Sequence, residues 1–280
     1  LGYKAISLTG WQAGIFTNSE YQSSKILDIN VSRIKQELSD GKIVVVTGFQ
    51  GIDEKNNITT LGRGGSDTTA VAVAAAIKAK HCYIFSDVDG VYTADPRDVK
   101  LAHKLNSISY EEMSYISGEG AKVLHDRCVE LAEKYDMPII AASTFNKNSG
   151  TKICNNLYQL DNNESKSNME GTVIKSIIKN DNIIYVEIED YTNPYELINT
   201  LVNTNIKIGQ YLIKDNKILF TINKLDRAKV QKLLDELDKK TKILPVTKIS
   251  IVGSGISNHI EIIKKVLDSF FDIKEDIIDI

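Results

Sequence analysis

Short apolar runs alternate with longer helical patterns from Ala5 to about Asn155, and this alternation constrains the fold more than any other feature of the sequence. Such alternation is typical of βαβ units around a mostly parallel sheet. The β-branched run Ile43–Thr47 predicts a central strand that is buried on both faces. The Ala- and Val-rich segment Thr68–Lys80 predicts a helix packed deep against that sheet, and Cys82–Phe85 predicts the next strand.

The second half of this region continues the same pattern. A helix is predicted from about Gly120 to Tyr135, where apolar residues recur at helical spacing, and Pro138 marks its exit into a strand at Ile139–Ala142. The stretch from Asn155 to Glu170 is crowded with Asn, Asp, Ser and Lys, which is typical of a linker. We therefore expect an α/β domain at 1–155 and a linker at 156–170.

The region after the linker has shorter elements and a different order. The predicted elements are a strand at Ile183–Ile188, a helix at Pro194–Asn203, strands near Ile206–Ile213 and Ile218–Ile222, and a helix at Leu225–Lys240. This βαββα order predicts one ferredoxin-like α+β module at 171–247. A strand at Lys248–Val252, a helix at Ile260–Phe270 and a strand from Ile273 then predict a second, truncated module at 248–280.

The composition argues against nucleic acid, a membrane or a metal ion as the binding partner. The 34 basic and 37 acidic side chains give a net charge of −3 and a pI near 5.9, without the basic excess of a nucleic-acid-binding protein. No apolar stretch approaches the roughly 18 residues that cross a bilayer, so we expect a cytoplasmic protein without a membrane partner. Cys82, Cys128 and Cys154 form no C-x-x-C pair and the histidines form no H-E-x-x-H pair, so we expect core thiols and no metal site.

The segment Gly62–Asp67 leads straight into the apolar helix at Thr68. Its glycines allow backbone N–H groups to approach a ligand, Ser66 and Asp67 can cap the helix, and the positive end of the helix favours an anion. Arg63 can bind a carboxylate or a phosphate with two parallel hydrogen bonds. A tight turn with an N-cap explains the same residues without any ligand. The segment is neither a Walker A loop nor a G-x-G-x-x-G motif.

The segment Ser86–Tyr92 follows a predicted parallel strand, at the end where ligands bind in open α/β sheets. Tyr92 can flank a base and Arg97 can meet phosphates, whereas Asp89-Gly90 is more typical of a turn. Lys122 falls in the first turn of the next predicted helix, a position more typical of a solvated lysine unless an anion binds there. We interpret 125–127 as a helix face.

Five segments resemble the motifs of aspartate kinase, in the order of that family. They are Ser7–Gly14, Val45–Gly51, Thr60–Asp67, Ser86–Tyr92 with Asp95–Arg97, and Gly120–His125. The Asp-Val-Asp-Gly-Val-Tyr segment also resembles other amino-acid kinases, such as glutamate 5-kinase and uridylate kinase, whereas Gly-Arg-Gly-Gly-Ser-Asp is far more specific. The resemblance implies a three-layer, mostly parallel amino-acid-kinase sheet, of which 1–155 is the C-terminal portion, and paired ACT domains after the linker.

The resemblance also implies an activity and a set of site residues. The activity is transfer of the ATP γ-phosphoryl group to the β-carboxylate of L-aspartate, with Mg²⁺ on the nucleotide. Asp67 would be the catalytic residue that positions the reacting groups, and Arg63, Gly65 and Ser66 would bind the substrate. The implied ATP-binding residues are Ser86, Asp87, Tyr92, Arg97 and Lys122. The residues implied for a lysine or threonine effector are Ser254, Gly255, Ile256, Ser257, Asn258 and His259.

The sequence departs from the family pattern at several points. The opening Lys-Phe-Gly-Gly-Thr-Ser segment, which supplies a catalytic lysine, does not occur, so we expect an inactive fragment that lacks both ends of the family's chain. Asp126 stands where the family has proline, and Asn193–Tyr195 stands where its effector loop is Gly-rich. Two other functions are compatible with these departures: a non-catalytic amino-acid sensor that dimerises through ACT modules, and a different amino-acid kinase. Pairing of exposed module edges predicts a homodimer or a larger homo-oligomer.

Overall fold

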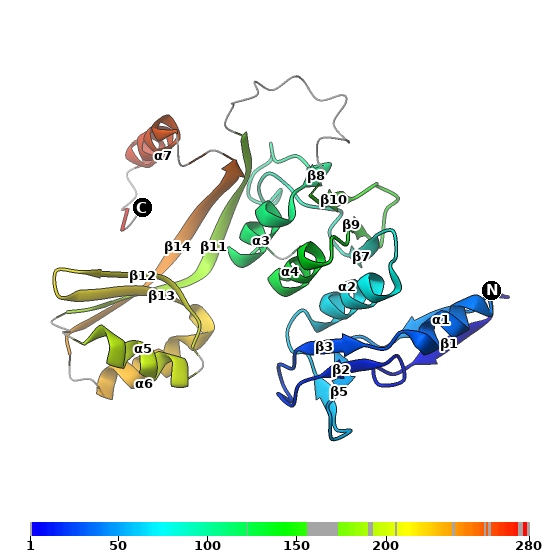
Figure 1. The fold of residues 1–280 in the computed structure, drawn as a ribbon. Coiled ribbons are helices and arrows are strands. Elements are labelled where there is room, and N and C mark those ends of the chain that lie inside the picture. Colours follow the sequence, from blue (N-terminus) through cyan, green and yellow to red (C-terminus); the bar gives the residue numbers. More distant parts are fainter. Residues whose placement is uncertain are drawn as a thin grey trace. The chain divides into compact units, whose positions relative to one another are not determined.

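The chain forms two compact units, which are described separately. The computed structural model describes residues 2–121, 123–155, 173–189, 193–204, 206–236, 239–254, 256, 259–273 and 277–278. The first unit comprises Leu1–Ile177 and Ile251–Ile280, and the second comprises Ile178–Ser250. The ribbon in Figure 1 follows the chain through both units. The predicted linker at 156–170 lies outside the described residues.

The first unit is a mixed α/β structure with three sheets. Its strands are β1 (Ala5–Leu8), β2 (Ile15–Thr17), β3 (Ile26–Ile29), β4 (Ile43–Val46), β5 (Gln50–Ile52), β6 (Ile58–Thr60), β7 (Cys82–Ser86), β8 (Ser107–Ile108), β9 (Ile139–Ser143) and β10 (Thr151–Ile153). Its helices are α1 (Ser32–Ser39), α2 (Gly65–Ile77), α3 (Tyr110–Gly118), α4 (Asp126–Lys134) and α7 (Ile260–Ile273). The strand orders are β1-β4, β3-β2-β5-β6 and β7-β9-β10-β8.

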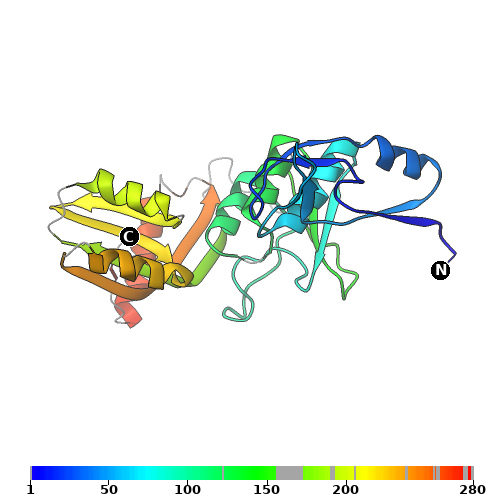
Figure 2. The ribbon, with the colours of Figure 1, turned by 90° about the horizontal axis from the view of Figure 1, so that it is seen from below.

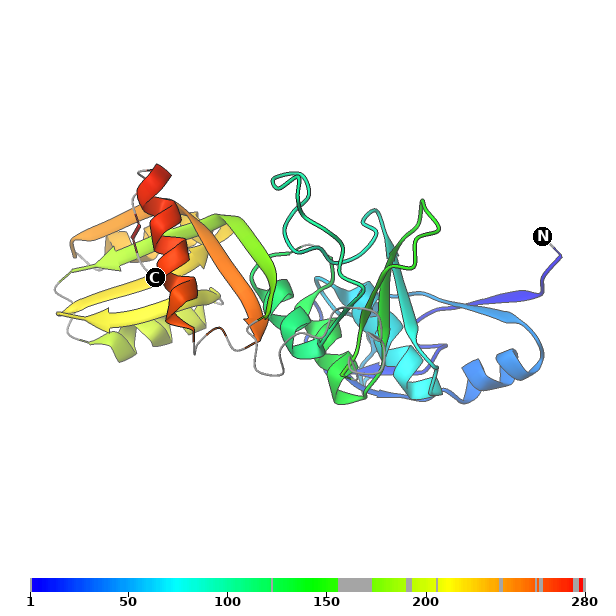
Figure 3. The same ribbon diagram turned by 90° about the horizontal axis from the view of Figure 1, so that it is seen from above.

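The pairing of β7 with β9 brings the loops that follow these two strands to the same edge of the sheet. The two strands are parallel, from Cys82 opposite Ile139 to Ser86 opposite Ser143, so their carboxyl ends meet at one edge of the sheet. The loops that follow β7 and β9 leave from this edge (Figure 3). The helices α2, α4 and α3 pack against one another in that order (Figure 1). Apolar side chains of these helices, such as Val71, Val129 and Ile116, are buried.

Two expectations for this unit are wrong. The strand at Ile43–Val46 exists, but it pairs only with β1 among the described residues, and 51% of Ile43 and 53% of Val45 remain exposed. A continuous apolar run therefore does not make this strand central. The helix predicted from Gly120 to Tyr135 begins only at Asp126, where the side chain of His125 accepts a hydrogen bond from the Arg127 N–H. A separate helix, α3, precedes it and was not predicted.

The second unit has the ferredoxin-like order of elements, which confirms the predicted fold class. Its elements are β11 (Val173–Ile188) from Ile178 on, α5 (Pro194–Asn203), β12 (Ile208–Lys214), β13 (Lys217–Asn223), the short 3₁₀ helix η2 (Lys224–Asp226), α6 (Arg227–Glu236) and β14 (Thr241–Ser254) up to Ser250. The strand order is β12-β13-β11-β14. Both helices lie on one side of this sheet (Figure 2), and Leu201, Phe220 and Leu234 share the core between the layers.

Local chemistry explains why α5 and the β12–β13 hairpin form where the sequence predicts them. Pro194 begins α5, and the Asn193 side chain accepts a hydrogen bond from the Glu196 N–H. The turn between β12 and β13 places Asp215 and Asn216 at φ of 49° and 58°, as a two-residue hairpin turn of matching twist requires.

The end of the second unit is built differently from the expected pattern. The predicted boundary between residues 247 and 248 falls inside β14, which runs without a break from Thr241 to Ser254 and completes a βαββαβ unit. The strand expected from Ile273 is wrong, because α7 still includes that residue.

Candidate active site

The Gly62–Asp67 loop turns into α2 without a side-chain cap. Gly64 precedes the helix at φ 67°, a left-handed conformation that favours glycine, and its carbonyl accepts hydrogen bonds from both the N–H and the Oγ1 of Thr68. The expectation that Ser66 or Asp67 caps the helix is wrong, since α2 begins at Gly65 and both residues lie in its first turn. Their side chains therefore stand at the positive end of the helix.

The three polar side chains of this loop differ in burial. Arg63 and Ser66 are exposed, whereas Asp67 is half-buried. Burial raises the pKa of Asp67 above its ordinary value, and an electrostatic interaction with His125 partly opposes this shift. A Cβ added to Gly48 would lie 3.3 Å from the Ser66 Cα, so the loop after β4 passes directly against the start of α2. The arrangement suits a carboxylate ligand, which Arg63 and the helix end can bind together.

A strained residue joins the β4 loop to α2. Phe49 has a φ of 72°, which is rare for a bulky side chain. Its N–H donates to Thr69 Oγ1 at 3.1 Å and its carbonyl accepts from the Leu61 N–H at 2.9 Å. These bonds hold the strained backbone in place on both sides. Strain of this kind is concentrated at functional sites.

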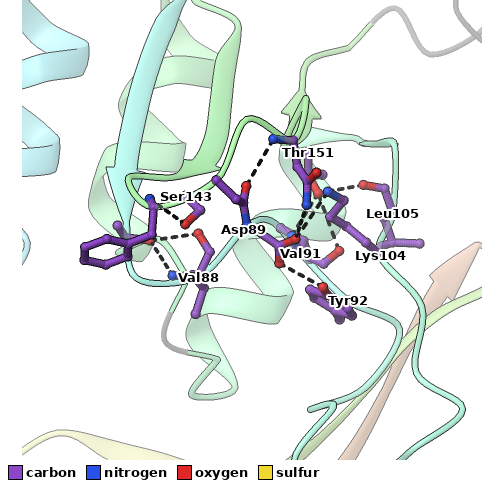
Figure 4. Close-up of polar contacts among 12 residues, drawn as sticks. Val88, Asp89, Val91, Tyr92, Lys104, Leu105, Ser143 and Thr151 are labelled. Atoms are coloured by element: carbon purple, nitrogen blue, oxygen red, sulfur yellow. Dashed lines mark hydrogen bonds and ion pairs between the residues drawn. The ribbon is translucent and has the colours of Figure 1, made fainter.

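The loop after β7 folds around its own side chains, as Figure 4 shows. Ser86 Oγ accepts a hydrogen bond from the Val88 N–H at 3.2 Å, and Asp87 is exposed. The Tyr92 hydroxyl donates to Asp89 Oδ1 at 2.8 Å. Arg97 is paired with Asp95, with Nη2 and Oδ2 2.6 Å apart. The Arg97 hydrogen bonds lower the pKa of Asp95 to about 2.

Asp89 is the centre of this loop, although its sequence context indicates only a turn. Besides Tyr92, its carboxylate accepts hydrogen bonds from Lys104 Nζ at 3.5 Å and Asn148 Nδ2 at 3.2 Å. These bonds, the Tyr92 hydrogen bond first, lower the pKa of Asp89. The Thr151 hydroxyl, in turn, accepts from the Val91 N–H and donates to the Leu105 carbonyl. The loops after β7 and β9 are thereby joined.

Two residues at the start of α4 contact the Gly62–Asp67 loop or the residue that precedes it. A Cβ on Gly64 would overlap the ring of His125. Arg127 Nη1 donates to the Leu61 carbonyl and Nη2 to the Ser24 carbonyl, both at 2.7 Å. The interpretation of 125–127 as a helix face missed both contacts, and no local pattern in the sequence indicates them.

Several expected site residues lie outside what the structure describes. They are Lys122, Gly255, Ser257 and Asn258, together with the side chain of Ser254. His259 is described: its N–H donates to the Ile256 carbonyl at 3.0 Å, and its Nδ1 lies 2.6 Å from Glu261 Oε1. Between residues 62–67 and 86–97, all of them described, no hydrogen bond or ion pair connects the two loops.

The described residues contain no group of three or more His, Cys, Asp or Glu side chains that is arranged to hold a metal ion. Searched over the same residues, no helix combines the length and the apolar composition needed to span a membrane. Cys82, Cys128 and Cys154 are buried free thiols, as predicted. Burial raises the pKa of Cys82 to about 11 and that of Cys128 to about 12, so both remain protonated near neutral pH.

Comparison with known sequences gives consistent matches. The profile of the amino acid kinase family matches residues 1–143. An aspartokinase of Bacillus sp. (strain MGA3) is 40% identical over 277 residues, which cover 92% of this chain and 64% of the relative. An aspartokinase of Geobacillus stearothermophilus is 39% identical over 284 residues, covering 97% of this chain and 67% of the relative. The chain thus spans about two thirds of the length of these curated relatives.

Solved structures show the same fold. Aspartokinase III of E. coli, in complex with aspartate and ADP, matches with a TM-score of 0.75 and 23% identity, over 96% of this chain and 62% of that chain. The aspartate kinase of Clostridium acetobutylicum matches with a TM-score of 0.72 and 23% identity, over 97% of this chain and 63% of that chain.

Proposed function

This chain belongs to the aspartokinase family, and on that premise we propose that the protein carrying it is an ATP-dependent aspartate kinase. The reaction transfers the γ-phosphoryl group of ATP to the β-carboxylate of L-aspartate and gives 4-phospho-L-aspartate, the first step of lysine, threonine and methionine biosynthesis. The observation that supports this most is the exposed Arg63 beside the N-terminus of α2, a site suited to a carboxylate, in a chain 40% identical to a curated aspartokinase. We also assign the enzyme to the cytoplasm, where ATP and free amino acids are available.

The loop residues take separate roles in this proposal. Arg63 binds a carboxylate of the substrate with its guanidinium, and the backbone at Gly65 and the Ser66 hydroxyl complete the binding site. A carboxylate nucleophile has no proton to lose, so Asp67 is not a general base. Asp67 instead orients charged groups around the reacting phosphoryl, and catalysis rests on positioning and charge stabilisation.

The loop after β7 is the proposed nucleotide site. Asp87 and Arg97 are exposed there, Ser86 and Tyr92 are fixed by hydrogen bonds within the loop, and Lys122 completes the set. The Arg97 guanidinium already forms an ion pair with Asp95, so a phosphate would compete with that carboxylate. Mg²⁺ bound with the nucleotide would neutralise charge on the phosphate oxygens.

The second unit and the segment after it are proposed to be regulatory ACT domains. The ferredoxin-like order of the second unit supports this, as does a match to the E. coli aspartokinase III structure in complex with lysine and aspartate. We propose lysine or threonine as the effector, bound within Ser254–His259, and a homodimer or larger oligomer formed through these modules.

Trapping of the product tests the proposed reaction on the full-length protein. An acyl phosphate reacts with hydroxylamine to a hydroxamate, so incubation with ATP, Mg²⁺, hydroxylamine and L-aspartate should yield aspartyl hydroxamate, and L-glutamate should not replace aspartate. Arg63→Ala should raise the KM for aspartate about tenfold or more, because a charged hydrogen-bonding partner is lost. Arg33→Ala, on the exposed face of α1, is the matched control.

The two possible failures have different meanings. Absence of hydroxamate from the full-length protein would contradict the kinase function and favour the amino-acid sensor. Hydroxamate formation with an unchanged aspartate KM in Arg63→Ala would leave the reaction intact and remove Arg63 from the substrate site.

A further inference from the structure

Arg127 connects three segments that are far apart in the sequence. Its two guanidinium nitrogens donate to the carbonyls of Leu61 and Ser24, which lie 66 and 103 positions away along the chain. Leu61 immediately precedes the Gly62–Asp67 loop. A planar guanidinium presents its donors in a fixed fork, so both carbonyls are held at a defined separation.

The partners of Arg127 are themselves well fixed. Ser24 is buried, and both its N–H and its hydroxyl donate to the Thr60 carbonyl, at 2.9 and 2.8 Å. Leu61 is 1% exposed, and its N–H donates to the Phe49 carbonyl. The end of β6 is therefore held on one side by the segment around Ser24 and on the other by the strained Phe49. Arg127, in α4, links the Ser24 and Leu61 segments by donating a hydrogen bond to each.

The neighbouring His125 holds the next part of the same loop. Its ring occupies the space in which a side chain at position 64 would lie. The start of α4 thus contacts the Gly62–Asp67 loop by packing at Gly64, and contacts Leu61, just before the loop, by a hydrogen bond. Leu61 precedes Arg63 along the chain and Gly64 lies between Arg63 and Ser66, so the two contacts hold the backbone that carries these side chains.

We propose that Arg127 is a positioning residue that fixes the Gly62–Asp67 loop for binding of aspartate. The proposal deepens the proposed function and rests on it. Arg127 does not touch the substrate: it acts through the Leu61 carbonyl, and loss of its fork loosens the loop that carries Arg63 and Ser66. The affinity for aspartate therefore depends on the two Arg127 hydrogen bonds. The conformation of the loop after β7 does not depend on them.

Amide hydrogen exchange tests the positioning without reference to catalysis. In Arg127→Met, which keeps an apolar stem but donates no hydrogen bond, the amides of Leu61, Gly65 and Thr68 should exchange about tenfold faster than in the wild type. Exchange of the Cys82 amide, which lies in β7 and donates to the Pro138 carbonyl, should be unchanged. Arg33→Met makes the same change on the exposed surface of α1 and should leave all four amides unchanged.

Steady-state kinetics on the full-length protein test the consequence for the substrate. The KM for aspartate should rise in the order wild type, Arg127→Lys, Arg127→Met, because an ammonium can bond one carbonyl but cannot span two in the fork geometry. The Arg127→Met value should be about tenfold above the wild type, with the KM for ATP unchanged. Partial rescue by lysine separates positioning from a merely structural role, which predicts equal changes for both substrates.

Each adverse result overturns a different statement. Unchanged exchange at Leu61, Gly65 and Thr68 would overturn the positioning role, whether or not the protein is a kinase. Faster exchange with equal shifts of both KM values would overturn the link to aspartate. A wild type that forms no aspartyl hydroxamate would contradict the proposed function, while the exchange result would still decide whether Arg127 holds the loop.

Discussion

At the scale of single residues, Asp67 combines burial with a charge, and this has a cost in stability. Its pKa is raised in the folded protein by burial, so the folded state disfavours the ionised form. Below the ordinary pKa of a carboxyl group the residue is neutral in both states and there is no penalty. As the pH rises through the folded-state pKa, the penalty develops in full.

Asp67→Asn should therefore stabilise the protein at pH 7 while it lowers turnover. The thermal midpoint should rise at pH 7, because the amide carries no charge that burial disfavours. The gain should shrink toward zero as the pH is lowered below 4, where wild-type Asp67 is protonated. Scanning calorimetry at both pH values measures this, with the exposed Asp28→Asn as the control. A lower midpoint at pH 7 would show that the Asp67 carboxylate is a stabilising group.

The sequence indicates the loop of the proposed site but not the residues that hold this loop in place. Gly62–Asp67 was identified because its glycines and its position before an apolar helix are local features. Asn148, one partner of Asp89, lies 59 residues away along the chain, and the two carbonyls that Arg127 binds lie 66 and 103 residues away. Contacts of this kind depend on how the strands pair, and a single sequence does not reveal that pairing.

At the scale of elements, α3 begins with a capping box. Ser109 Oγ accepts the Glu112 N–H at 3.1 Å, and Glu112 Oε2 accepts the Ser109 N–H at 3.1 Å. Ser109→Ala should destabilise the first unit by about 0.5–2 kcal/mol. The substitution removes the acceptor of the Glu112 N–H and disrupts the reciprocal bond to the Ser109 N–H. Urea unfolding measures the change. Ser39→Ala, near the end of α1, removes an exposed hydroxyl and is the control. An equal effect of both variants would contradict the cap.

This capping box was the local signal that could have revealed α3. The prediction instead extended one helix across 120–135, because Val123 and Leu124 continue the apolar spacing of Cys128 and Leu131. Spacing alone does not show where a helix begins, and His125 supplies the N-cap that does. By contrast, Pro194 and the Asp215-Asn216 turn carry their conformations in their own chemistry, so α5 and the β12–β13 hairpin were predicted well.

At the scale of the whole molecule, the proposed regulation requires that an amino acid bound near the second unit changes the activity of the first. Lysine or threonine at millimolar concentration should raise the thermal midpoint of the full-length protein, since a ligand that binds only the folded state stabilises it. Ligand concentrations of 100 times the Kd give about 2.7 kcal/mol. Methionine and D-lysine serve as controls. If neither lysine nor threonine shifts the midpoint or inhibits the enzyme, the ferredoxin-like unit is structural.

The division into two compact units has a spectroscopic consequence. Trp11 is the single tryptophan of the sequence, it belongs to the first unit and it is 51% exposed. The second unit, Ile178–Ser250, contains tyrosine and phenylalanine but no tryptophan. Emission excited at the red edge of the indole band therefore reports on the first unit alone, whereas circular dichroism of the peptide backbone records both. The two signals, followed together during denaturation, distinguish the melting of one unit from the melting of the other without any label.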